Sequence, residues 1–297
     1  MDVKEPRNPG PWGGYFFMYA FDRWLPGWLF EAMMQTGTFI AFCLMKKQRL
    51  YSRQYLELIL DRPVSWRDSF RHFRALADML LVKLRAGRGD SVPMEWADEK
   101  SRQQGSLILG SEPILVGTFH VGASDLLGFG LGQFNRPICM VRQRVRNSAD
   151  IDRLMRQASS QVEIMWVNDP REVIFGLRDA LEAGKTLALQ CDRLEHTSKT
   201  AAFDFLGERR LFPVTIYRLA ALYQRPVQFC LALPAAKGYE VHACRPFVPS
   251  GKNHREDIRS GYVHFQEVLH WLEALLRQQP LQWFNFLPLN PSDSPEV

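Results

Sequence analysis

The sequence predicts an α/β fold, with a mixed, largely parallel sheet flanked by helices and an apolar helical segment in front of it. Five apolar, strand-like runs follow one another from residue 114 onward, and stretches with helical periodicity separate most of them. Strands that alternate with helices favour a parallel sheet covered on both faces. The chain has 297 residues, of which 46% are apolar and 12% aromatic, so it has enough material for one large core.

Residues 12–45 form the most apolar part of the chain. The stretch 24–45, WLPGWLFEAMMQTGTFIAFCLM, has about the ~20 residues that a membrane-spanning helix needs. Glu31 and Gln35 interrupt it, and a charge at mid-bilayer costs on the order of 2.5–3.5 kcal/mol. An interfacial or re-entrant helix therefore fits this composition at least as well as a span.

Two further features of this segment favour contact with a membrane. Tryptophan suits the headgroup level of a bilayer, and the segment contains three such residues: Trp12, Trp24 and Trp28. A basic cluster at 46–49 follows, and such clusters stay on the cytoplasmic side. We expect residues 1–48 to contact a membrane, and residues 49–297 to form one domain at its cytoplasmic face. The alternative is an ordinary helical hairpin buried against the core.

The first helix of the predicted domain covers residues 65–87. Ser65 and Asp68 have the spacing of a capping box, with Ser65 as the N-cap. Apolar residues recur at helical spacing behind them, and Gly87 is a natural stop. The remaining face is basic, which is typical of a solvated or membrane-facing surface.

The α/β pattern begins at Pro113. The predicted strands are 114–119, 138–142, 162–167, 186–191 and 227–233. Residues 171–185 are the clearest helix among them, since their apolar side chains share one face and Gly184 ends it. A second helix is predicted at 213–226, with Pro213 at its first position.

Charge and cysteine content limit the classes of function. The net charge of +5 favours an anionic partner: phospholipid headgroups, nucleic acid or an acidic carrier protein. We do not expect nucleic acid, because the aromatic residues fall mostly at apolar, buried-looking positions. The five cysteines lack CxxC spacing, which predicts buried thiols in a reducing compartment and no zinc site.

The candidate active site follows the strand 114–119. Reactive groups in α/β proteins gather beyond the carboxyl ends of the strands, and His120 lies at that position. If residues 122–124 begin a helix, Asp125 lies in its first turn and can reach back to His120. A carboxylate on one imidazole nitrogen fixes the tautomer, and the other nitrogen is then free to take a proton from a hydroxyl.

The loop between these two residues has a predicted role as well. Gly122 allows a substrate to approach the backbone closely, and the helix N-terminus supplies N–H donors for a developing oxyanion. The sequence contains no G-x-S-x-G motif and no cysteine beside a histidine. The reaction therefore need not pass through a covalent acyl-enzyme.

A series of motifs in one order resembles the lysophospholipid acyltransferase superfamily, in particular its branch of bacterial lipid A biosynthesis (lauroyl/myristoyl) acyltransferases. The resemblance covers most of the chain and includes the apolar N-terminus. HVGASD resembles the H-x4-D/E motif of that superfamily. The other motifs are FRHF, MVRQRVRNSADIDRLMRQ, LALQCDR, FDFLGERRLFPVTIYRLAALYQRPVQF and QQPLQWFNFLP.

The resemblance implies a glycerolipid acyltransferase-like fold and an O-acyltransferase. Its donor would be an acyl-carrier-protein or coenzyme A thioester, and its acceptor a hydroxyl of a membrane glycolipid or related lipid. It implies His120 as the general base and Asp125 as its partner in a catalytic dyad. It also implies substrate contacts for Arg142, Asp192 and Arg193. No metal or organic cofactor is expected, because thioester and hydroxyl already contain the chemistry.

The sequence departs from the family at CDRLEHTSKT, where Cys191 precedes the aspartate and no glycine is nearby. The identity of the acceptor therefore stays open, and localisation at the cytoplasmic face of an inner membrane is an expectation. Two alternatives remain. One is a non-catalytic lipid-binding protein on the same fold. The other is a metal-dependent hydrolase with ligands His120, Asp125, Asp192 and His196.

Overall fold

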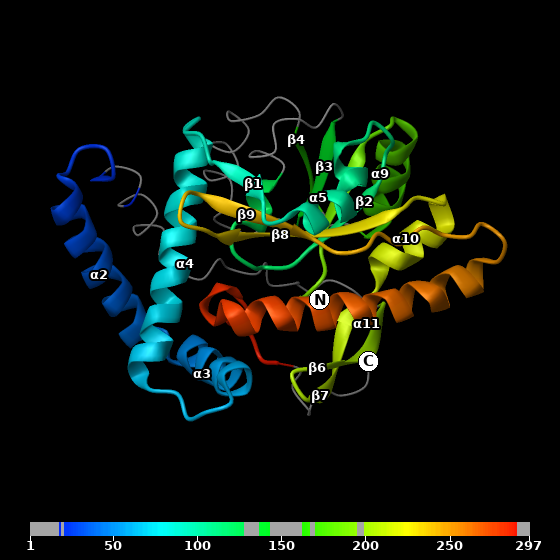
Figure 1. Cartoon of the computed structure of the whole chain (residues 1–297). Coiled ribbons are helices and arrows are strands. Elements are labelled where there is room, and N and C mark those ends of the chain that lie inside the picture. The colour runs from blue at the N-terminus through cyan, green and yellow to red at the C-terminus, as the bar shows by residue number, and fades with distance from the viewer. Residues whose placement is uncertain are drawn as a thin grey trace.

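A computed structural model describes Met18 and residues 21–127, 137–142, 162–166, 170–194 and 199–289. Its centre is a seven-stranded sheet in the order β1-β9-β8-β2-β5-β3-β4 (Figure 1). The strands are β1 (Met94–Trp96), β2 (Leu115–Thr118), β3 (Ile138–Arg142), β4 (Val162–Trp166), β5 (Thr186–Gln190), β8 (Val227–Pro234) and β9 (Tyr239–Ala243). Neighbouring strands run parallel except β8 and β9, so the predicted mixed, largely parallel sheet is confirmed.

Helices cover both faces of this sheet, as the sequence predicts. They are α2 (Gly27–Leu44), α3 (Lys46–Leu60), α4 (Trp66–Gly87), α5 (Glu99–Gln104), α6 (Ser106–Leu109), α9 (Pro170–Glu182), α10 (Thr215–Tyr223) and α11 (His254–Gln278), with the short 3-10 helices η1 (Ser124–Leu126) and η2 (Pro280–Gln282). The long helix α11 runs along one face of the sheet, while α2 lies on the outer side of α4 (Figure 1).

Side chains of β8 show how the two cores form. Successive side chains of a strand point to opposite faces. Phe229 and Leu231 belong to the cluster that α3, α9, α10 and α11 complete, whereas Cys230 and Ala232 belong to the cluster on the other face. Every residue of β8 except the last is buried, as expected for a central strand with both faces covered.

Strand β2 lies between β8 and β5, and all four of its residues are buried. Gly117 is needed there, because a Cβ would lie 2.3 Å from the ring of Phe229. Thr118 at the end of β2 is in register with Gln190 at the end of β5. The residues that follow these two strands therefore emerge side by side at one edge of the sheet.

Helix α4 begins as predicted, with Ser65 as N-cap and a reciprocal hydrogen bond from the Ser65 backbone N–H to Asp68. It ends at Gly87, and Gly89, rather than Gly87, has the positive φ of 93°. Ion pairs tie it to the N-terminal segment, since both Arg85 and Arg88 contact the carboxylate of Asp22.

The sequence analysis missed an antiparallel hairpin, β6 (Thr200–Phe205) and β7 (Glu208–Pro213). Leu206 and Gly207 form its two-residue turn, and both have positive φ. Pro213 is therefore the last residue of β7 and not the first of a helix; α10 begins two residues later at Thr215.

Within the described residues, no single helix is long and apolar enough to cross a membrane. Helices α2 and α3 meet the length and composition test only together, and they are bent by 96° at Met45. Membrane contact by residues 1–48 therefore stays a prediction.

Candidate functional site

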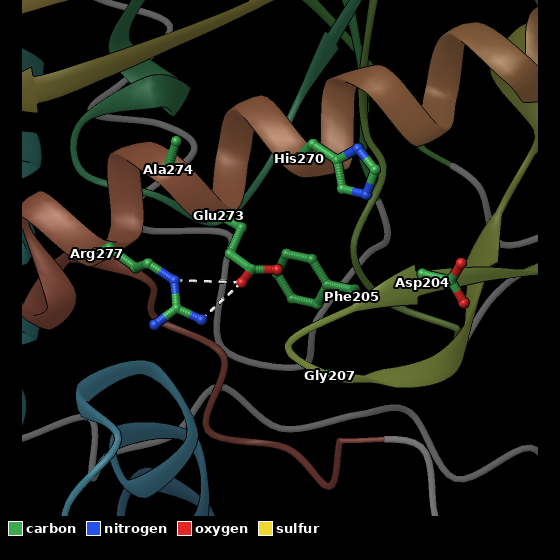
Figure 2. Close-up of a pocket in the computed structure, with 7 residues that line it drawn as sticks. All are labelled: Asp204, Phe205, Gly207, His270, Glu273, Ala274 and Arg277. Atoms are coloured by element: carbon green, nitrogen blue, oxygen red, sulfur yellow. Dashed lines mark hydrogen bonds and ion pairs between the residues drawn. The ribbon is translucent and has the colours of Figure 1, made fainter.

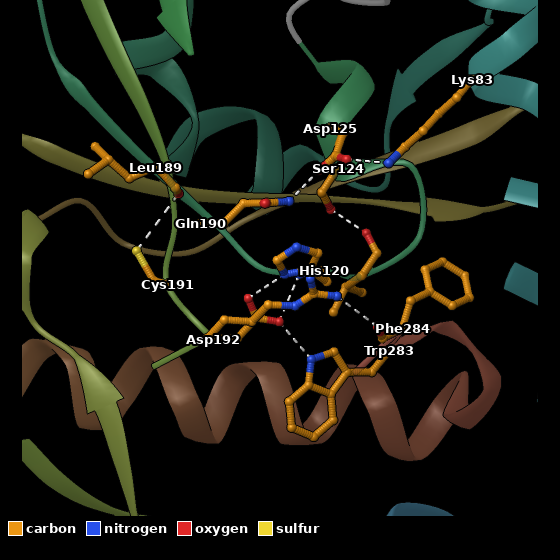
Figure 3. Close-up of polar contacts among 12 residues, drawn as sticks. Lys83, His120, Ser124, Asp125, Leu189, Gln190, Cys191, Asp192, Trp283 and Phe284 are labelled. Carbon is orange, nitrogen blue, oxygen red and sulfur yellow. Dashed lines mark hydrogen bonds and ion pairs between the residues drawn. The ribbon is translucent and has the colours of Figure 1, made fainter. Parts of the chain in front are cut away.

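The sheet register brings His120 and Asp192 together at the carboxyl ends of the central strands (Figure 3). Each residue lies two positions beyond the aligned pair Thr118 and Gln190. The His120 Nδ1 lies 2.7 Å from Asp192 Oδ1, and the His120 backbone N–H donates to Asp192 Oδ2 at 2.9 Å. His120 thus lies beyond the end of β2, which is the position that the sequence predicts for this residue.

Asp192 is a buried carboxylate whose negative charge is well compensated. Its side chain has no exposed surface, and burial by itself raises its pKa. The charge and hydrogen bond of His120 outweigh burial, with help from Arg193 and the indole of Trp283, so the pKa of Asp192 lies below its usual value. An ionised carboxylate only accepts hydrogen bonds, so Nδ1 of His120 carries a proton, and the lone pair of the neutral ring is on Nε2.

Asp125 lies on η1, and its two oxygens accept from side chains of two other elements. The Lys83 ammonium of α4 pairs with Oδ2, and the Gln190 amide at the end of β5 donates to Oδ1 (Figure 3). The sequence predicts Asp125 to be the carboxylate that pairs with the His120 ring. In the structure, the carboxylate at Nδ1 of His120 is Asp192 instead. A catalytic contribution of Asp125 itself stays a prediction.

The backbone of the loop after His120 is not arranged as an oxyanion hole. Gly122 N–H donates to Gln282 O at 2.8 Å, and Ala123 N–H donates to Ala232 O at 2.8 Å. Val121 and Ser124 donate within the loop, to Phe119 O and Val121 O. The expectation that these amides stabilise an oxyanion is therefore wrong for this conformation, because backbone carbonyl oxygens already accept from all four N–H groups.

The structure explains why a glycine is present at position 122. Its φ is 51°, and a Cβ would lie 2.1 Å from Ala232 O, so β8 approaches the loop too closely for any side chain. The predicted contact of Gly122 with substrate remains a prediction.

The other predicted site residues are only partly placed. Arg193 follows Asp192, and its Nη2 donates to Phe284 O at 3.4 Å. Its buried Nε has no hydrogen-bond partner among the described residues. Arg142 is the last residue of β3, but its side chain lies outside the described part of the chain.

Three residues of this group escaped the sequence analysis: Lys83, Gln190 and Trp283. Lys83 reads as one charge on the basic face of a helix, and Gln190 as the last residue of a strand. Trp283 lies in the motif QWFNFLP, which is apolar and looks like core. Its indole donates to Asp192 Oδ2 at 2.9 Å. The sequence signal for this contact is weak: a tryptophan in a core-like motif is expected to be buried, and a buried indole N–H usually has a hydrogen-bond partner.

A separate open depression of about 380 Å³ lies between the β6–β7 hairpin and α11 (Figure 2). Glu273 and Arg277 form an ion pair in it at 2.7 Å, and Glu273 also accepts from Leu206 N–H. The contact between Glu273 and Leu206 attaches the hairpin to α11, and the depression is not part of the group around His120.

No protein-family model matches the chain, and no curated protein matches it. The acyltransferase resemblance consequently remains a prediction from motifs. Among the described residues, no group of three or more His, Cys, Asp or Glu side chains has the arrangement of a metal site. His196, one of the four ligands considered for a metal hydrolase, lies outside them.

Proposed function

We propose that the protein is an O-acyltransferase that moves a fatty acyl chain from a thioester of acyl carrier protein or coenzyme A to a lipid hydroxyl. One observation carries the proposal: His120 stands at the end of a buried central strand, with Nδ1 on the ionised carboxylate of Asp192. This arrangement leaves Nε2 as a base with a fixed tautomer. The H-x4-D motif and the order of motifs along the chain support the same class.

In the proposed reaction, Nε2 of His120 takes the proton of the acceptor hydroxyl as its oxygen attacks the thioester carbonyl. The tetrahedral intermediate collapses, the carbon–sulfur bond breaks, and the leaving thiolate receives the proton from the imidazolium. Asp192 stabilises that imidazolium without itself becoming protonated. Thioester and alcohol thus become ester and thiol, with no other reactant.

The acceptor is proposed to be a membrane glycolipid or a related lipid intermediate, which requires the protein to reach a bilayer. The outer side of α2 has the composition for that contact. Side chains at every fourth position of this helix are exposed and uncharged: Trp28, Ala32, Thr36, Ile40 and Leu44. Trp28 and Leu44 are each 75% exposed, whereas Phe30 and Met34 face the protein. An exposed apolar stripe of this kind suits an interfacial helix.

Basic side chains near the end of this stripe fit a membrane with anionic lipids. Lys46 and Lys47 follow Met45, the residue after Leu44, and both are exposed. Their charge favours the cytoplasmic leaflet of an inner membrane and also an acidic carrier protein. Arg193 and Arg142 remain our candidates for contact with an anionic group of donor or acceptor.

The test is mass spectrometry of lipid extracts from cells that make the wild-type protein, the His120→Ala variant or neither. We expect a lipid heavier by one acyl chain only with the wild type, and that lipid identifies acceptor and chain length together. A purified assay with the thioester donor then checks that His120→Ala abolishes transfer. If the purified protein binds lipid and no extract contains a new acylated species, the proposal is replaced by the non-catalytic lipid-binding function.

A further inference from the structure

The C-terminal segment 279–286 lies directly against the loop that carries His120. Side by side, the two segments resemble a short two-stranded ladder. The contacts are Phe284 N–H to His120 O (2.7 Å), Gly122 N–H to Gln282 O (2.8 Å) and an antiparallel bridge between Val121 and Trp283. This segment comes from the far end of the chain, so the catalytic loop is complete only after the C-terminus has packed.

The side chain of Trp283 reaches from this segment to the carboxylate behind His120 (Figure 3). Its indole Nε1–H donates to Asp192 Oδ2 at 2.9 Å, and Trp283 is 1% exposed. The same oxygen accepts the His120 backbone N–H at 2.9 Å. With Oδ2 held by two donors, Oδ1 is the oxygen left for Nδ1 of His120.

We infer that Trp283 is a positioning residue of the proposed transferase, whose indole N–H fixes Asp192 so that this carboxylate orients His120. The inference rests on the proposed function. It assigns to the C-terminal segment a part in the reaction that is distinct from filling the core. Its indole N–H contacts Asp192 and not the ring of His120, so the role that we infer is exerted through Asp192.

The indole itself is held by contacts that do not involve its N–H. His72 on α4 donates from Nε2 to Trp283 O at 2.9 Å. The ring packs edge-on against Tyr55 at 5.0 Å and Phe205 at 5.4 Å between centroids. Replacement by phenylalanine therefore keeps a buried aromatic ring and removes mainly the hydrogen bond to Asp192.

The N–H also takes up part of the negative charge of Asp192. Without it, the carboxylate attracts the imidazolium of the proposed reaction more strongly. Other charged or titratable groups surround the pair and are unchanged by the substitution: Arg193 and Cys191 beside Asp192, Asp125 on η1, and Lys83 and His72 on α4. If the Trp283 ring only fills space, its replacement by phenylalanine does not change the attraction between Asp192 and the imidazolium.

The first measurement is steady-state kinetics of Trp283→Phe over a range of pH. We expect kcat to fall about 10-fold with little change in KM, since a hydrogen bond to a charged group is lost. The acidic limb of the kcat profile shifts to higher pH. The control is Trp271→Phe, which changes a partly buried indole on α11 that packs against the same core.

The second measurement needs no substrate. In protein labelled with 15N-histidine and 15N-tryptophan, the ring nitrogen resonances of His120 shift in Trp283→Phe. In the otherwise wild-type chain, Asp192→Asn shifts the indole N–H resonance of Trp283. The resonances are assigned from their loss in His120→Gln and Trp283→Phe. The Asp192→Asn experiment decides the question even if Trp283→Phe does not fold.

These readings separate the inference from the function on which it rests. If acyl transfer is absent but both resonance shifts occur, the proposed function fails while the contact stands. If transfer depends on His120, yet Trp283→Phe matches Trp271→Phe in kcat, pH profile and His120 resonances, the positioning role of Trp283 is overturned. The positioning role is also overturned if the Trp283 indole N–H resonance does not shift in Asp192→Asn.

Discussion

His120 and Asp192 are 72 residues apart in the chain, and their side chains meet at 2.7 Å because β2 and β5 pair in register. Asp125, only five residues from His120, instead accepts from Lys83 and Gln190. Two carboxylates therefore surround the candidate base with different partners, and they are expected to contribute differently.

The first prediction compares these two carboxylates. Asp192→Asn places an amide at Nδ1 of His120, which favours the wrong tautomer, so we expect kcat to fall by about 10²–10⁴-fold. Asp125→Ala is expected to lower the rate less and to retain donor binding. Kinetics of both variants with the thioester donor measure this. A larger loss of kcat in Asp125→Ala contradicts the assignment of Asp192 as the orienting residue.

The second prediction concerns the ion pair of Lys83 and Asp125, whose side chains are 17% and 11% exposed. Lys83→Met removes the cationic partner of this mostly buried carboxylate, so the free energy of unfolding falls by about 1–3 kcal/mol. The control is Arg53→Met, which breaks an exposed pair with Glu57 and costs at most about 0.5 kcal/mol. Equal losses in denaturant titrations of the two variants speak against the partly buried pair as a stabilising contact.

The third prediction is a pH dependence of stability from His72. This fully buried ring contacts Ser52 and Trp283, and burial lowers its pKa to about 4. The unfolded chain, with a histidine pKa of about 6.5, binds the proton first, so stability is full above that pH and falls between about 6.5 and 4. The loss approaches about 3 kcal/mol.

Denaturant unfolding at several pH values measures this slope. We expect His72→Gln to be less stable at neutral pH but to lose less stability on acidification. The exposed His254 provides the control, since His254→Gln keeps the wild-type slope. A slope that His72→Gln leaves unchanged refutes the assignment.

The fourth prediction concerns Gly122. Gly122→Ala places a Cβ 2.1 Å from Ala232 O at a φ of 51°, so either the loop or β8 must move. We expect a loss of at least about 2 kcal/mol in the free energy of unfolding. Gly184→Ala is the control: its φ is 75°, nothing lies within 4 Å of the new Cβ, and the cost is about 1 kcal/mol. Equal costs show that close approach of β8 is not the constraint.

The fifth prediction tests the exposed stripe of α2. The double variant Trp28→Glu, Ile40→Glu is expected to lose about 10-fold or more of its binding to vesicles with anionic lipids, with unchanged thermal stability. Leu222→Glu is the control, because Leu222 is 60% exposed on α10, far from α2 in Figure 1. Sedimentation with vesicles measures binding. If the control loses as much as the double variant, α2 is not the contact surface.

The sequence alone determined the features that depend on neighbouring residues. Apolar, strand-like runs placed β3 at its observed bounds and the other four predicted strands within one residue of theirs at each end. The capping box of Ser65 and Asp68 located the start of α4, and the end of β2 located His120. These signals are local because backbone hydrogen bonding and side-chain direction repeat over a few residues.

Only the tertiary structure decided which side chains meet at the site. Hydrophobic runs show that β2 and β5 are strands but not that they are neighbours, and this pairing gives His120 its carboxylate in Asp192. The contribution of Trp283 depends on the packing of the C-terminal segment, and that of Lys83 on the position of α4 beside η1. Such contacts join residues far apart in the chain, so local periodicity carries no information about them.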